Sequence, residues 1–117
     1  MAAPRRAEQI AAFLSFAQDL CDRQQLADLA GYPNLLADPE YRAANRKILS
    51  VEYGRRYAKV VETIPHSRSV YCFLDLDNGD ILKAEGWLKP AKHARGSLDD
   101  PGRWPEAVTA YGGVYLR

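Results

Sequence analysis

The chain of 117 residues has little of what builds metal sites and disulfides. It contains two cysteines, Cys21 and Cys72, and two histidines, His66 and His93, all far apart in the sequence. A structural zinc site takes three or four Cys and His ligands at short spacings, so we expect no metal site. Both cysteines fall on apolar faces of expected elements, which indicates buried thiols in a reducing compartment.

Long apolar runs and a strong net charge are also missing. No run of about 18 apolar residues occurs, so we expect no membrane partner. The first six residues, MAAPRR, lead into a helical pattern and not into the apolar core of a signal peptide. With a net charge of only +1, any binding of nucleic acid must rest on local patches. The composition, 47% hydrophobic and 26% charged, favours one soluble globular domain over residues 1–117.

No catalytic motif is complete. Neither a Gly-x-Ser-x-Gly elbow nor a Cys–His signature is present, so we expect no enzyme, no catalytic residue and no cofactor. Three aspartates, Asp75, Asp77 and Asp80, suggest a calcium loop. Counted from Asp75, however, Gly79 occupies the fifth position, where Asp or Asn is required, and Gly86 replaces the bidentate glutamate. Hairpin-turn chemistry explains these aspartates better.

The first 46 residues are expected to be helical. Over residues 5–30, apolar side chains recur at three- and four-residue spacings, and Gly31 suits the C-terminal cap. Asp38 and Pro39 have the chemistry of an N-cap and a first helical position, which predicts a second, short helix through Asn45.

Residues 47–117 are expected to be mainly β-structure. Residues 49–53 alternate in polarity, residues 57–64 are rich in β-branched side chains, and residues 70–76 are apolar on both faces. Asn78-Gly79 favours a type I′ hairpin with a return strand at 81–84. The sequence therefore predicts an α+β fold, with a long N-terminal helix packed on an antiparallel sheet of four or five strands. The last seven residues are a possible further edge strand.

Residues 81–96 form a basic segment, with four cations against the single acidic residue Glu85. Pro90 and Gly96 suit the start and end of a short helix at 90–95, whose free N–H groups would bind an anion. Trp87 offers a ring on which a base can stack. We therefore expect ligand binding by Trp87, Lys89, Lys92, His93 and Arg95.

A second basic segment covers residues 42–59. It contains six Lys or Arg residues and a single acidic residue, Glu52, with two tyrosines interleaved. This pattern is typical of a nucleic-acid or nucleotide surface. Arg55, Arg56 and Arg68 are therefore second candidates for ligand binding. The alternative for both segments is that the cations only decorate solvated loops.

Four motifs carry a family resemblance: Ser69–Phe73 (SVYCF), Asn78–Lys83 (NGDILK), Trp87–Gly96 (WLKPAKHARG) and Tyr111–Arg117 (YGGVYLR). They resemble a family of small, mostly uncharacterised proteins of tailed bacteriophages, over roughly residues 47–97 and the C-terminus. The resemblance implies a phage protein that acts in the host bacterial cytoplasm. It carries over no catalytic residue.

These observations favour a non-enzymatic phage accessory protein that binds a phosphate-bearing ligand. That ligand is either single-stranded nucleic acid or a small nucleotide, including a host defence signal that the phage would sequester. The alternative is a protein-binding inhibitor of a host enzyme or defence system, for which the basic patch would contact an acidic protein surface. The apolar surplus of the central strand and the helix also predicts a homo-oligomer, most simply a dimer.

Overall fold

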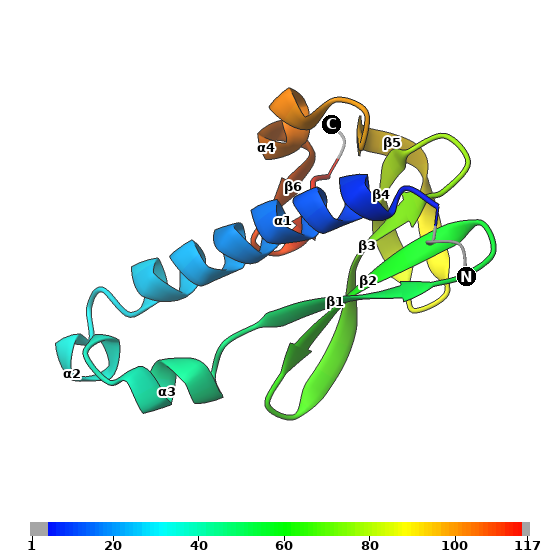
Figure 1. The fold of residues 1–117 in the computed structure, drawn as a ribbon. Helices are drawn as coiled ribbons and strands as arrows, with labels where there is room; N and C mark the ends of the chain where they lie inside the picture. The colour runs from blue at the N-terminus through cyan, green and yellow to red at the C-terminus, as the bar shows by residue number, and fades with distance from the viewer. Residues whose placement is uncertain (1–4, 116–117) are drawn as a thin grey trace.

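The computed structural model describes residues 5–115 and confirms the α+β fold (Figure 1). Helix α1 (Ala7–Asp28) buries Ile10, Phe13, Ala17 and Cys21 along one stripe, as the spacing predicts. Its C-cap is Leu29 in a right-handed conformation, so the expected cap at Gly31 is wrong. No helix within residues 5–115 combines the length and apolar character that a membrane crossing requires.

Two short helices connect α1 to the sheet: α2 (Pro33–Leu36) and α3 (Pro39–Ala44). The second was predicted from its cap. The Asp38 carboxylate accepts hydrogen bonds from the backbone N–H groups of Glu40 and Tyr41, at 3.0 and 3.1 Å. This satisfies two of the donors that a helix start leaves without partners.

Five antiparallel strands follow in the order of the chain: β1 (Ile48–Tyr53), β2 (Tyr57–Ile64), β3 (Ser67–Asp75), β4 (Asp80–Gly86) and β5 (Lys89–Ser97). Each strand lies beside its neighbours in sequence, so the sheet is a meander of hairpins, and it is strongly twisted (Figure 1). The helix packs on one face of this sheet, where Val60, Cys72 and Leu74 join the buried stripe of α1 in the main core.

The main core is closed by residues that follow β5. A 3₁₀ turn (Pro101–Arg103) leads into helix α4 (Trp104–Ala107). Trp104 is 7% exposed and meets the Phe13 ring edge-to-face, with centroids 5.3 Å apart. Its indole N–H donates to the Ser97 carbonyl at 2.9 Å, so the polar end of the buried ring is satisfied.

The short helix expected at residues 90–95 is wrong. These residues belong to β5, which pairs with β4 through Ala84–Pro90 and Leu82–Ala94. Pro90 is tolerated there because β5 is an edge strand, where a missing N–H need not break a ladder. The same Pro and Gly that suit helix ends therefore stand in an irregular strand, and the anion site expected at a helix start does not exist.

The β3–β4 turn also differs from the expected type I′ hairpin. The last register pair is Leu74 with Ile81, β3 ends at Asp75 and β4 begins at Asp80, so four residues, 76–79, lie between the two strands. The N–H of Gly79 donates to the Asp75 carbonyl at 2.7 Å, and Gly79 has a φ of 84° while Asn78 has no positive φ. A type I′ turn requires positive φ at both central residues.

The C-terminal segment does not extend the five-stranded sheet. Strand β7 (Gly112–Gly113) pairs instead with β6 (Val108–Thr109) in a separate two-stranded sheet. Residues 116 and 117 of the expected edge strand lie outside the described residues. Several bonds dock this segment, including those from the Tyr71 hydroxyl to the Thr109 carbonyl (2.5 Å) and from Lys47 to the Ala110 carbonyl (2.9 Å).

Gly112 and Gly113 lie against the backbones of two different strands. A Cβ at Gly112 would stand 2.5 Å from the Tyr71 carbonyl oxygen on β3, and a Cβ at Gly113 would stand 2.8 Å from the Cα of Lys83 on β4. We call residues 112–113 the bridging segment. Because only glycine fits at such approaches, this Gly-Gly pair is explained by packing.

The sheet opens at this bridging segment. Strands β3 and β4 form register pairs only at Phe73–Leu82 and Leu74–Ile81. Continued, this register would place Tyr71 opposite Ala84 and Ser69 opposite Gly86, but neither pair forms. The two strands therefore diverge beyond the turn, and their central pairing is short.

We predict that Gly112→Ala lowers the free energy of unfolding by about 1–3 kcal/mol, because the φ of 114° is unfavourable for alanine and its Cβ would meet the Tyr71 carbonyl. Urea unfolding followed by circular dichroism measures the difference. Gly102→Ala is the matched control, since a Cβ at Gly102 has nothing within 4 Å. Equal stability of the two variants would contradict the bridging role.

Candidate ligand surface along β4 and β5

Four of the eight expected ligand-binding residues line one hollow along β5. Lys89, Lys92, His93 and Arg95 share this space of about 340 Å³ with the exposed ring of Tyr115. We call it the β5 hollow; its full lining is Glu85, Lys89, Pro90, Ala91, Lys92, His93, Arg95 and Tyr115. A single carboxylate, Glu85, faces these cations, so the hollow favours an anionic ligand.

Trp87 lies in a second, adjoining hollow. The separation of β3 and β4 leaves a space of about 380 Å³, the Trp87 hollow, lined by Arg68, Ser69, Val70, Ala84, Glu85, Gly86 and Trp87. Glu85 lines both hollows, so the two meet at the β4–β5 hairpin. The structure thereby brings Trp87 and Arg68 together and places the β5 cations beside them.

Two cations already contact the Trp87 ring. The Lys59 amino group lies 4.1 Å from the ring centroid, and the Arg68 guanidinium carbon lies 5.6 Å from it. Arg68 also donates to Glu52 at 2.7 Å. Trp87 remains 42% exposed, which leaves part of its surface available to a ligand.

Lys59 is a residue that sequence reasoning counted as basic but did not assign to the site. It stands opposite Phe73 in the β2–β3 register, on the face of the sheet away from α1. That face has its own buried apolar residues outside the main core, namely Val61, Phe73, Leu82 and Ala91. The alternation of side chains along β2 determines which face of the sheet Lys59 occupies. Its contact with Trp87 depends in addition on how β4 and β5 curve across the sheet.

Arg95 has a structural task that the sequence did not reveal. Its Nε donates to the Val114 carbonyl at 2.8 Å and its Nη1 donates to the His93 carbonyl at 2.5 Å. It therefore ties the residue after the bridging segment to β5. Tyr115 follows directly and its ring lies 4.1 Å from the Lys83 amino group, a cation–π contact.

Arg55 and Arg56 do not join the two hollows. They lie in the β1–β2 turn, which adjoins the β3–β4 turn through a 2.7 Å bond from the Leu76 N–H to the Arg56 carbonyl. Arg56 donates to the buried carboxylate of Asp75 at 3.2 and 3.3 Å, and this hydrogen bond raises the pKa of Arg56. Its charge compensates Asp75, which is 2% exposed.

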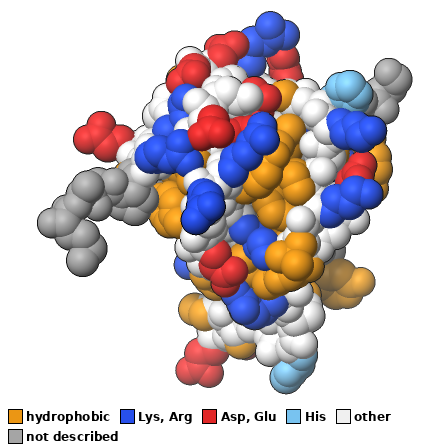
Figure 2. Space-filling view, turned by 90° about the vertical axis from the view of Figure 1, so that its right-hand side faces the viewer, with side chains coloured by type: hydrophobic (Ala, Val, Ile, Leu, Met, Phe, Trp, Pro, Cys, Tyr) orange, Lys and Arg blue, Asp and Glu red, His pale blue; other side chains and the backbone are white. Residues whose placement is uncertain are grey.

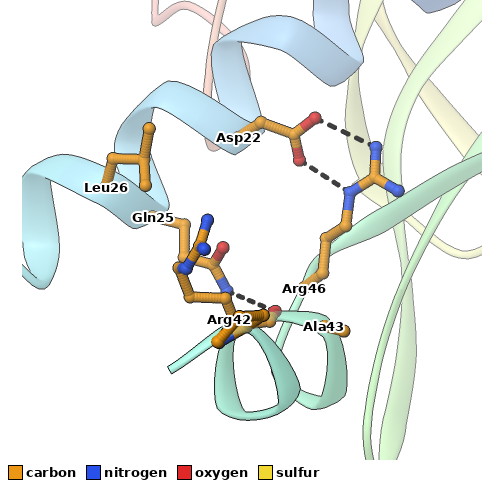
Figure 3. Close-up of a pocket in the computed structure, with 7 residues that line it drawn as sticks. Asp22, Gln25, Leu26, Arg42, Ala43 and Arg46 are labelled. Atoms are coloured by element: carbon orange, nitrogen blue, oxygen red, sulfur yellow. Dashed lines mark hydrogen bonds and ion pairs between the residues drawn. The ribbon is translucent and has the colours of Figure 1, made fainter. Parts of the chain in front are cut away.

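The basic segment at residues 42–59 is dispersed among intramolecular partners. Arg46 donates to both oxygens of Asp22 at 2.9 and 3.0 Å, and Lys47 lies 3.1 Å from Glu62. The bond from Arg46 lowers the pKa of Asp22. Figure 3 shows the first pair in a hollow of about 350 Å³ between α1 and α3, where Gln25 also donates to the Arg42 carbonyl. Arg46 therefore ties the residues before β1 to α1, and Lys47 ties them to β2.

Figure 2 shows the side of the molecule that is at the right of Figure 1. A band of hydrophobic side chains runs down this side, with Lys and Arg side chains on both flanks. In the described residues five Lys or Arg groups lie over aromatic rings, at Tyr57, Tyr111 and Tyr115 once each and at Trp87 twice. Cations and aromatic rings are therefore interleaved at several places on the surface.

The two cysteine thiols line neither hollow and are poorly activated. Burial raises the pKa of the Cys21 thiol to about 11 and also raises the pKa of the Cys72 thiol, so both are protonated at neutral pH. Both are free and buried, as predicted. Within residues 5–115, no three His, Cys, Asp and Glu side chains gather as a metal site.

Comparison with known proteins gives a family without an assigned activity. Residues 1–116 match the model of a family of unknown function, DUF7717, and the chain belongs to that family. No curated protein and no solved structure matches it.

We predict that Arg95→Ala lowers the free energy of unfolding by about 1–3 kcal/mol, because two backbone carbonyls lose a charged donor. Thermal unfolding measures this loss. Lys92→Ala, at an exposed neighbour in the same hollow, serves as the control and should unfold near the wild-type temperature. An unchanged melting temperature for Arg95→Ala would show that the contact with Val114 does not hold the C-terminal segment.

Proposed function

We propose that this protein is a non-enzymatic phage accessory protein that binds a phosphate-bearing ligand on the surface formed by β4 and β5. One observation carries the proposal: Lys89, Lys92, His93 and Arg95 line a single hollow whose only carboxylate is Glu85. The adjoining Trp87 hollow adds an exposed ring and Arg68. Cations that converge beside aromatic rings are the usual means of holding phosphates and bases together.

The shape of the surface favours an extended ligand over a small one. Two hollows adjoin at Glu85, and cations stand along both, from Arg68 to Arg95. A mononucleotide has one base and one cluster of phosphates, and it would use only part of this surface. A single strand has repeating phosphates and bases, which suit repeating cations and rings. We therefore favour single-stranded nucleic acid over a nucleotide signal, within the host cytoplasm that the phage resemblance implies.

The alternative, an inhibitor that binds a host protein, has one supporting feature. Leu88 at the tip of the β4–β5 hairpin is 81% exposed and stands next to Trp87. Exposed apolar residues beside cations also suit a protein partner with acidic residues. Such a partner would be retained from host lysate after nuclease treatment, whereas nucleic acid would not. The homodimer stays a prediction from the sequence.

The test is salt-dependent binding of a fluorescently labelled single-stranded oligonucleotide. We predict that binding weakens as salt rises and strengthens with oligonucleotide length, because phosphate contacts release counterions. The double variant Lys89→Ala, Lys92→Ala should bind about tenfold more weakly or worse, and its slope of log affinity against log salt should fall by about 1.4, since each phosphate contact contributes roughly 0.7.

The matched control is Arg23→Ala with Arg103→Ala, which removes two exposed cations that pair with Asp19 and Glu106 outside the two hollows. This control should keep both the affinity and the salt slope near wild type. Tight binding of a mononucleotide that is indifferent to strand length would favour the small-ligand class. Equal losses in both double variants would show that charge alone, and not this surface, carries the binding.

A further inference from the structure

The geometry points to a base-binding site: we propose that the Trp87 hollow takes an unpaired nucleobase of a single-stranded nucleic acid. The inference rests on the proposed function, and it assigns the bases and the phosphates of the strand to different parts of the surface. Phosphates would lie on the cations that flank the two hollows, and one base would enter the opening between β3 and β4.

The opening has the right chemistry for the edge of a base. Register pairs join β3 to β4 only at Phe73–Leu82 and Leu74–Ile81, so none joins residues 68–70 to residues 84–86 across the hollow. In an antiparallel sheet, alternate backbone N–H and C=O groups point toward each neighbouring strand. Those of β3 and β4 that point toward this opening have no strand partner across it. A base edge presents both donors and acceptors, which backbone groups can satisfy.

Trp87 supplies the stacking surface for that base. It lines the hollow together with Arg68, whereas Lys59, which lies 4.1 Å from the ring centroid, is not part of the lining. Trp87 is 42% exposed, so part of the ring that lines the hollow can meet a base although two cations lie beside it. Stacking of a base on an aromatic side chain changes affinity by roughly 5- to 150-fold.

The space suits one base and not a packed core. Its volume of about 380 Å³ lies within the range of roughly 300–1,000 Å³ that is typical of small-molecule pockets. Its lining is mixed, with the backbone of two strands, one indole, one guanidinium and the Glu85 carboxylate. Ser69 is already engaged, since its hydroxyl donates to Glu62 at 2.6 Å, so the polar groups left for a base are the strand backbones and the side chains of Arg68 and Glu85.

Arg68 and Lys59 are placed to hold the phosphates next to this base. Arg68 donates to Glu52 at 2.7 Å and lies beside the ring, and both groups of this ion pair are about half exposed. A phosphate can therefore reach the guanidinium without displacing a buried partner. Beyond the hairpin, Lys89 and Lys92 continue the run of cations into the β5 hollow.

The experiment compares two strands of equal length and charge. One is a fluorescently labelled single-stranded DNA with normal bases, and the other carries abasic residues at every position. We expect wild-type protein to bind the normal strand about 5- to 150-fold more tightly, because only that strand fills the hollow. Trp87→Ala should bind both strands alike, at the level of the wild-type protein with the abasic strand.

Two controls separate stacking from folding and from general aromatic contact. Trp87→Phe keeps a ring and should retain part of the preference for bases. Tyr53→Ala removes an aromatic ring of similar exposure, 43% against 42%, that lines neither hollow, and should retain the full preference. Intrinsic fluorescence gives a second readout: the normal strand should quench the exposed Trp87, and Trp87→Phe, which keeps the buried Trp104, should lose this quenching.

The outcomes distinguish the two proposals. Equal, salt-dependent affinity of wild-type protein for both strands would overturn the base site and leave the phosphate-binding function intact. A base preference that survives in Trp87→Ala would also overturn it, since the base would then bind elsewhere. Absence of binding to either strand would overturn the base site together with the preference for single-stranded nucleic acid, and would leave the small-nucleotide class to be tested with a mononucleotide.

Discussion

The close contact of the bridging segment with two strands is the constraint on which the rest of the candidate ligand surface depends. Gly112 meets the carbonyl of Tyr71, and Gly113 meets the Cα of Lys83, at distances that leave no room for a Cβ. The segment is held by Arg95, Tyr71 and Lys47, which bond to the carbonyls of Val114, Thr109 and Ala110. The two strands that it contacts stop pairing near this point. The C-terminal residues, last in the chain, thereby shape the opening in the middle of the sheet.

Electrostatics divides the cations into two sets. Arg46, Lys47 and Arg56 compensate Asp22, Glu62 and Asp75, and they stabilise contacts between segments that are distant in sequence. The cations of β4 and β5 have few such partners among the described residues: Glu85 lies 3.6 Å from Lys89 in an exposed pair, which contributes little to stability. Because Asp22, Glu62 and Asp75 pair with cations outside the two hollows, a chain with a net charge of only +1 can still concentrate positive charge along β4 and β5.

The sequence predicted the elements well where a local pattern determines them. The stripe of α1, the Asp38 cap and the alternation of the strands are properties of neighbouring residues, and the structure confirms them. The helix expected at 90–95 failed because Pro90 and Gly96 fit both a helix boundary and an irregular edge strand, and only the pairing with β4 decides between them. Local chemistry alone does not settle such a choice.

The candidate site shows the same limit. Trp87, Lys89, Lys92 and His93 were recognised from composition, and the structure places them around two adjoining hollows. The contact of Lys59 with Trp87, the bond from Arg95 to Val114 and the use of Arg56 by Asp75 all join residues 19 to 28 positions apart. No local sequence pattern predicts these contacts, because they depend on strand register and on the path of the C-terminal segment.

The opening between β3 and β4 is the feature that a single measurement tests most directly. In a nuclear Overhauser spectrum of the isotope-labelled protein, we expect contacts from Gly112 to Tyr71 and from Gly113 to Lys83. We expect no cross-strand contact between the backbone amide or Hα protons of Tyr71 and Ala84 or of Ser69 and Gly86. Strong contacts within those two pairs would mean that the β3–β4 ladder continues and closes the Trp87 hollow, and would contradict this account.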